Sequence, residues 1–95
     1  MKLEFWQMVS CNHLVLARVC KTIDWQQPLP RCGEYVEGLD TLDGEQELPV
    51  RKLLHRMQDG SCLAELPGFH IAQLRLSYRE LEQLAAQKGW TLQKL

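Results

Sequence analysis

Side chains that bind metals or act as nucleophiles are scattered through the sequence rather than gathered in a motif. They are four cysteines and three histidines: Cys11, Cys20, Cys32, Cys62, His13, His55 and His70. Structural zinc sites take two ligands from one tight turn, as in C-x-x-C or H-x₃₋₅-H. Only Cys11 and His13 lie that close together, and no second pair accompanies them. The spacing does not predict a zinc site, and we expect no metal and no cofactor.

A thiolate nucleophile with a histidine base needs only that the fold bring the two side chains together. Cys20 and Cys62 lie inside apolar runs, where a buried thiol behaves as an unreactive hydrophobic group. Cys32 follows Arg31 in a loop-forming segment and is the most exposed candidate for a reactive thiol. The spacing selects no pair, so we expect no catalytic activity and rank a thiol-dependent enzyme third among the functional hypotheses.

A run of six acidic residues without lysine or arginine lies in the middle of the chain. It comprises Glu34, Glu37, Asp40, Asp43, Glu45 and Glu47. An EF-hand alignment centred on Asp43-Gly44 leaves the key calcium-binding positions without carboxylates, so calcium binding is not predicted. A loop of like charges speeds association with a basic partner. We expect Asp40, Asp43, Glu45 and Glu47 to rim a protein-binding surface; a merely solvated loop is the alternative.

A basic cluster follows at Arg51, Lys52, His55 and Arg56. Small barrels bind nucleic acid through basic faces interleaved with aromatic rings, but no aromatic residue lies within this run. The net charge of −1 also lacks the basic excess of a duplex-binding domain. We expect the acidic run to neutralise the cluster. Nucleic-acid binding through Arg51, Lys52 and Arg56 is the second functional hypothesis.

Tryptophan is abundant here, with three residues among 95, and it is enriched at the energetic centres of protein interfaces. We expect Trp6 or Trp25 to anchor a partner from a strand with one uncovered face. Filling the core of a small domain is the alternative for each. The first hypothesis is therefore a small accessory module that binds a protein or associates with itself, such as an adaptor, an inhibitor or an immunity-like factor.

Period-2 alternation of apolar residues predicts the strands that position these groups. Five strands are expected, at residues 2–9, 14–23, 48–57, 62–66 and 69–76. The first two form a hairpin around Ser10–His13, and Asp59-Gly60 supplies a tight turn between the third and fourth. A helix over residues 50–58 is the main alternative to the third strand, because its apolar residues also have helical spacing.

A loop is expected over residues 26–31, where Pro28 and Pro30 remove amide donors, and a loop or a loose hairpin tip around Asp43-Gly44 is expected over residues 38–47. Between them, Leu29-Pro30-Arg31-Cys32-Gly33-Glu34-Tyr35-Val36 resembles the lead-in to a strand of SH3-like and other small β barrels. The resemblance covers eight residues. It implies a barrel-like arrangement of the sheet.

A C-terminal amphipathic helix is predicted over residues 78–88. Ser77 and Glu80 form a capping box, and Gly89 has the position of a left-handed C′ residue. Trp90 is placed to fold back onto the helix. The opening Leu76-Ser77-Tyr78-Arg79-Glu80 resembles the first helix of the helix-turn-helix domain in quorum-sensing-type response regulators. Only six residues follow Gly89, too few for a recognition helix.

The expected fold is thus α+β, a small antiparallel sheet or SH3-like partly open barrel of about five strands with one C-terminal helix. Its length fits a single domain over residues 1–95, and 45% hydrophobic residues support one core. The longest strongly apolar stretch, Leu14–Ala17, is far shorter than the roughly 20 residues that cross a bilayer, so no membrane partner is expected. The N-terminal residues do not resemble a secretory signal. We expect a cytoplasmic protein with reduced cysteines.

Overall fold

A long hairpin forms the centre of the fold, which a computed structural model describes for all residues from 1 to 95. Strands β1 (Lys2–Cys11) and β2 (Leu14–Asp24) pair antiparallel around Asn12 and His13. Both turn residues have positive φ, 50° and 67°. Two such residues give a turn whose twist matches that of the flanking strands. The predicted hairpin is confirmed.

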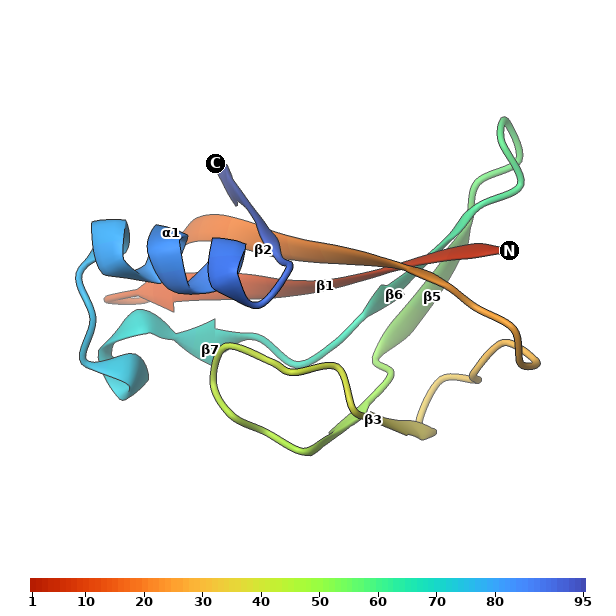
Figure 1. The fold of residues 1–95 in the computed structure, drawn as a ribbon, viewed down its shortest axis with the longest axis horizontal. Helices are drawn as coiled ribbons and strands as arrows, with labels where there is room; N and C mark the ends of the chain where they lie inside the picture. The colour runs from red at the N-terminus through yellow and green to blue at the C-terminus, as the bar shows by residue number, and fades with distance from the viewer.

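The main sheet has the order β5-β6-β1-β2-β8, and β7 lies beside the far end of β1 (Figure 1). The added strands are β5 (Lys52–His55), β6 (Cys62–Glu65), β7 (Phe69–His70) and β8 (Thr91–Lys94). β6 and β7 run parallel to β1, whereas the other pairs are antiparallel. The α+β class with one C-terminal helix is confirmed, but the sheet is mixed rather than purely antiparallel and does not close into a barrel.

Two of the strand predictions have different outcomes. The strand predicted over 48–57 is confirmed over the alternative helix only for Lys52–His55, which forms β5 and pairs with β6, whereas Leu48 and Pro49 lie in a separate short strand of a second sheet. The strand predicted over 69–76 ends at His70, and the 3-10 helix η1 (Ile71–Leu74) replaces the rest. The reason is a local cap: the His70 ring accepts a hydrogen bond from the Ala72 amide, which closes the first turn of η1.

A second, two-stranded sheet flanks the segment that the sequence predicted as a loop or a loose hairpin tip. It consists of β3 (Tyr35–Glu37) and β4 (Glu47–Pro49), which pair antiparallel. Val36 and Leu48 lie opposite each other and are only 6% and 3% exposed. Burial of these two side chains in the common core holds the short sheet against the rest of the protein.

The core lies on one face of the main sheet. On β1 the odd-numbered residues Leu3, Phe5, Gln7 and Val9 are fully buried. The helix α1 (Tyr78–Gln87) crosses in front of β1 and β2 (Figure 1), and its Leu81 and Ala85 belong to the same core. The even-numbered residues of β1 point to the opposite face of the sheet.

Both ends of α1 match the sequence prediction. The Ser77 side chain accepts a hydrogen bond from the Glu80 amide, and the Glu80 carboxylate accepts one from the Ser77 amide. At the other end Gly89 has φ 80°, and the Trp90 amide donates to the Ala85 carbonyl at 2.8 Å. This left-handed cap satisfies carbonyls that the helix leaves free. The helix also carries no segment long and apolar enough to cross a membrane.

The capping box makes stability sensitive to acid. Hydrogen bonds from the amide and hydroxyl of Ser77 lower the pKa of Glu80 below its usual 4.5. Because the folded-state pKa is the lower one, this stabilisation is present above about pH 4.5 and is lost as the pH falls through the folded-state value. Ser77→Ala is expected to lower the free energy of unfolding by about 1 kcal/mol at neutral pH. Only part of the deficit should disappear in acid, because alanine lacks the Ser77 hydroxyl but keeps the backbone amide that is the main cause of the lowered Glu80 pKa; urea unfolding from pH 7 to pH 3 measures this change. Glu82→Gln, on the exposed face of α1, is the control and should leave the pH profile unchanged.

Candidate functional site

The structure separates the two tryptophans that the sequence suggested as anchors. Trp6 lies on β1, is half-buried and does not belong to the core. The guanidinium of Arg18 lies 5.5 Å from the centre of its ring and is held there by two hydrogen bonds to Gln93. Such a cation–π contact covers one face of the indole. Trp6 is therefore already partnered within the protein.

Trp25 packs on the core side instead. Its ring meets Phe5 edge to face, with centroids 5.7 Å apart, and its Nε1–H donates to the Pro28 carbonyl at 3.1 Å. The indole thus fixes the segment that follows β2. One side of Trp25 remains exposed in a surface cleft.

The four acidic residues suggested as a rim are also divided. Asp40 forms an ion pair with Lys88 at 3.1 Å, and its carbonyl accepts a hydrogen bond from Trp90 Nε1. Asp43 and Glu45 lie on the same loop, where the Glu45 carbonyl accepts a hydrogen bond from Thr41. These contacts attach the loop to the end of α1. Glu47 alone lies on β4, across from β3.

The basic cluster is not neutralised by the acidic run, contrary to expectation. Arg56 pairs with Glu4 of β1 at 3.6 Å, and Lys52 lies opposite Glu65 of β6. Arg51 is exposed and makes a backbone hydrogen bond to Glu65. The register of the main sheet supplies the acidic partners, because β6 and β1 are the next strands after β5. Arg51, Lys52 and Arg56 are thus interleaved with carboxylates.

One cysteine meets a histidine. Cys62 Sγ lies 3.2 Å from His55 Nδ1 across the β5–β6 pair, and Cys62 is 1% exposed. Burial is also the main cause that raises the pKa of Cys20 to about 11, which keeps that thiol protonated at neutral pH. Cys32 is exposed and free. No three of the histidine, cysteine and acidic side chains gather where they could hold a metal ion.

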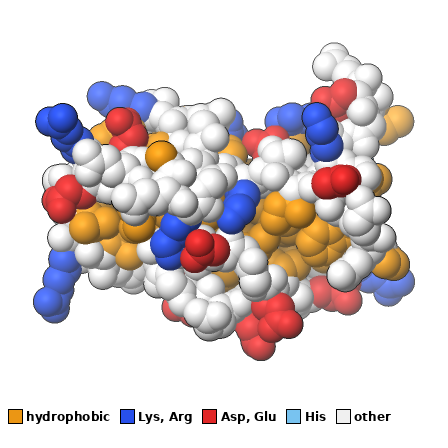
Figure 2. Space-filling view, in the orientation of Figure 1, with side chains coloured by type: hydrophobic (Ala, Val, Ile, Leu, Met, Phe, Trp, Pro, Cys, Tyr) orange, Lys and Arg blue, Asp and Glu red, His pale blue; other side chains and the backbone are white.

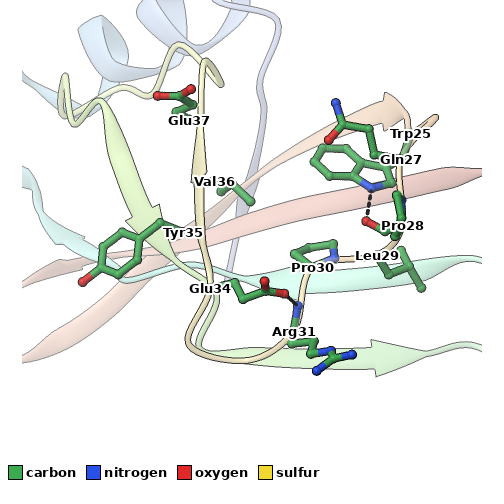
Figure 3. A pocket seen from close by; sticks show the side chains of 10 residues that line it. All are labelled: Trp25, Gln27, Pro28, Leu29, Pro30, Arg31, Glu34, Tyr35, Val36 and Glu37. Carbon is green, nitrogen blue, oxygen red and sulfur yellow. Dashed lines mark hydrogen bonds between the residues drawn. The ribbon is translucent and has the colours of Figure 1, made fainter.

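An open cleft of about 690 Å³ lies between the segment after β2 and strand β3 (Figure 3). One wall consists of residues 25 and 27–31, in which Gln27 and Arg31 accompany Trp25 and the apolar Pro28, Leu29 and Pro30, and residues 34–37 form the other. None of the residues that line the cleft belongs to β4, the strand paired with β3. Figure 2 shows hydrophobic side chains gathered above acidic ones on one face of the molecule. The volume is in the range of natural ligand sites.

The backbone of β3 presents an open edge to this cleft. The Val50 amide donates to the Glu34 carbonyl, which makes Glu34 a hydrogen-bonded partner of Val50. Bonded and non-bonded pairs alternate along an antiparallel ladder, so Val36 bonds Leu48, while Tyr35 and Glu37 direct their N–H and C=O groups away from β4. Pro49, opposite Tyr35, agrees with this register because proline has no N–H to donate.

The opposite wall leaves that edge free. Pro28 and Pro30 lack amide hydrogens, and the Pro28 carbonyl is occupied by the Trp25 indole. This wall therefore cannot form a strand ladder with β3. No hydrogen bond outside the β3–β4 pairing involves the backbone of Tyr35 or Glu37.

An exposed aromatic side chain and several carboxylates border the cleft. Tyr35 is 67% exposed, although it is an aromatic residue on a short strand. Beside it Glu37 and Glu47 lie directly opposite each other across the β3–β4 pair, and neither forms an ion pair. Like charges in this position repel. Glu34 differs, because its carboxylate accepts a hydrogen bond from the Arg31 amide at 2.6 Å.

Sequence reasoning missed Tyr35 and Glu37 as site residues. A signal was present: Pro49 falls two residues after Glu47, and a proline inside a strand marks an edge or a position without a ladder bond. Comparisons of the chain with protein-family models, with curated proteins and with solved structures found no match.

Proposed function

We propose that this chain is a small protein-binding accessory module, and that the cleft between Trp25–Arg31 and β3 is where it holds its partner. The observation that carries the proposal is the open edge of β3 beside a wall in which Trp25, Pro28, Leu29 and Pro30 lie together with Gln27 and Arg31. Unpaired strand edges are usually covered, charged or twisted away because they template pairing with other chains. An edge left open next to exposed Tyr35 has the features of a docking site.

Several contacts argue for a rigid, preformed site. Trp25 is fixed by Phe5 and by Pro28, the prolines restrict the backbone of one wall, and Val36 anchors β3 in the core. A preformed site loses little conformational entropy on binding. The module acts without catalysis in this proposal, as an adaptor or inhibitor does. Its place is the cytoplasm, where thiols such as the free, exposed Cys32 stay reduced.

Site-specific photocrosslinking tests this function. Tyr35 is replaced by the photoreactive benzoylphenylalanine, which keeps an exposed aromatic side chain at that position, and the protein is irradiated in lysate of the cells that produce it. We expect a discrete crosslinked product whose yield falls when unlabelled protein competes. The matched control carries the same group at Met57, which is 93% exposed on the β5–β6 hairpin. Equal products from both positions, or none from position 35, would contradict the proposal.

A further inference from the structure

We infer that the cleft receives an extended segment of the partner as an additional strand on β3, with basic side chains flanking an apolar one. This inference rests on the proposed function, since it specifies the chemistry of the partner that the cleft binds. It is carried by the geometry of the open edge and by the charges that face it.

Backbone pairing comes first. Tyr35 and Glu37 each offer one N–H and one C=O to a neighbouring strand. An extended segment laid along β3 satisfies these groups with every second residue, because alternate residues of a strand direct their polar groups to the same side. Added strands bind in this manner, with main-chain hydrogen bonds for affinity and side chains for specificity.

Side-chain placement then follows from the pleat. Residues directly opposite each other on paired strands point to the same face. Partner residues opposite Tyr35 and Glu37 therefore project on the exposed face that carries Tyr35, Glu37 and Glu47. The residue between them projects on the side of Val36, toward the Trp25 and Leu29 wall of the cleft.

Charge decides what fits on the exposed face. Glu37 and Glu47 oppose each other without a cation, so a lysine or arginine opposite Glu37 would relieve their repulsion. The exposed Tyr35 ring adds a surface on which a cation can rest. The occupant is thus a polypeptide segment of alternating basic, apolar and basic residues.

The test begins with a surface-displayed library of random octapeptides selected on the wild-type protein. We expect enrichment of the basic–apolar–basic pattern. The enriched peptide is then synthesised with single backbone N-methyl groups. Methylation of amides that face β3 should weaken binding about fivefold to tenfold, the effect of one lost hydrogen bond, while the alternate amides change little. Absence of enrichment, or no two-residue alternation, overturns the inference.

Two variants of the protein at Glu37 test the same backbone and charge contacts that the peptide changes test. Glu37→Pro removes the amide donor that residue 37 offers at the open edge, and it removes no hydrogen bond within the β3–β4 pair. This variant should bind the peptide about fivefold to tenfold more weakly. Glu37→Gln should reduce the preference for lysine over acetyl-lysine, whereas Glu82→Gln on α1 should not. An unchanged preference in Glu37→Gln overturns the charge assignment. Crosslinking from position 35 without N-methyl sensitivity would leave the binding function standing and reject strand addition alone.

Discussion

Replacing Trp90 with alanine is expected to lower the free energy of unfolding by about 3–5 kcal/mol, the range for a buried aromatic residue. Trp90 is 3% exposed and joins three parts of the protein. Its amide closes the end of α1, its Nε1–H donates to the Asp40 carbonyl at 2.9 Å, and Lys21 Nζ lies 5.6 Å from its ring centre. The total free energy of unfolding of a small domain is only about 5–15 kcal/mol, so the variant should lose much of its stability. Urea unfolding followed by far-ultraviolet circular dichroism measures the loss.

Trp90→Phe separates packing from hydrogen bonding. Phenylalanine retains most of the apolar surface but leaves the Asp40 carbonyl without its donor, so a smaller loss of about 1–2 kcal/mol is expected. Asp40 has φ 54°, a backbone conformation that non-glycine residues seldom adopt, and the indole is one of the groups that hold it. A loss below about 1 kcal/mol for Trp90→Ala would show that the tryptophan does not join these segments as described.

Phe5→Ala should lower the free energy of unfolding by a similar amount, about 3–5 kcal/mol, because Phe5 is fully buried on the central strand of the main sheet. It also supports the cleft, since the Trp25 ring packs edge to face against it. Removing Phe5 should therefore lower the affinity for the enriched octapeptide as well as the stability of the fold. Urea unfolding measures the loss of stability. Titration with the peptide, at a temperature where the variant remains folded, measures the loss of affinity.

Phe5→Leu is the matched control for this variant. Leucine retains much of the apolar volume, so a smaller loss, below about 1.5 kcal/mol, is expected. Met57→Ala, at a residue that is 93% exposed, should change stability by no more than about 0.5 kcal/mol. A Phe5→Ala variant that unfolds early but binds the peptide as tightly as wild type would show that Trp25 is held independently of Phe5.

Much of the candidate site could not be predicted from the sequence. The acidic residues of this run look alike along the chain, yet their partners differ in the structure. Asp40 is paired with Lys88, Glu34 accepts a hydrogen bond from the Arg31 amide, and Glu37 and Glu47 face each other without a cation. Lys88 lies 48 residues from Asp40. Spacing along the chain carries no information on such distant partners, so the charged residues that remain free are known only once the fold is known.

The surroundings of Trp6 and Trp25 also depend on residues that are distant in the sequence. Trp6 has the alternation of a half-exposed strand residue, and the prediction of an uncovered sheet face was reasonable for it. The sequence does not show that Arg18 covers the ring or that Gln93, 75 residues from Arg18, holds the guanidinium in place. Trp25 lines the cleft only because Phe5 and Pro28 fix it there.

Local signals by themselves determined the hairpin, the β5–β6 pair and the helix. Each depends on residues within a few positions of one another: positive-φ residues at a turn, the Asp59-Gly60 turn, and the Ser77–Glu80 capping box. Such signals act at short range, where closing the loop costs little entropy and the backbone preference of each residue decides the outcome. These elements were therefore predictable.

Only the tertiary structure decided the parallel placement of β6 and β7 on β1, the β3–β4 sheet, and the open edge that this sheet presents. Gly68 shows why: a Cβ there would lie 2.6 Å from the Met8 carbonyl oxygen, so the chain passes β1 closely only because this residue has no side chain. From the sequence alone, Pro67-Gly68 indicates only a turn or a bulge. Which strand edge accepts a distant segment, and which is left free for a partner, depends on burial summed over the whole core.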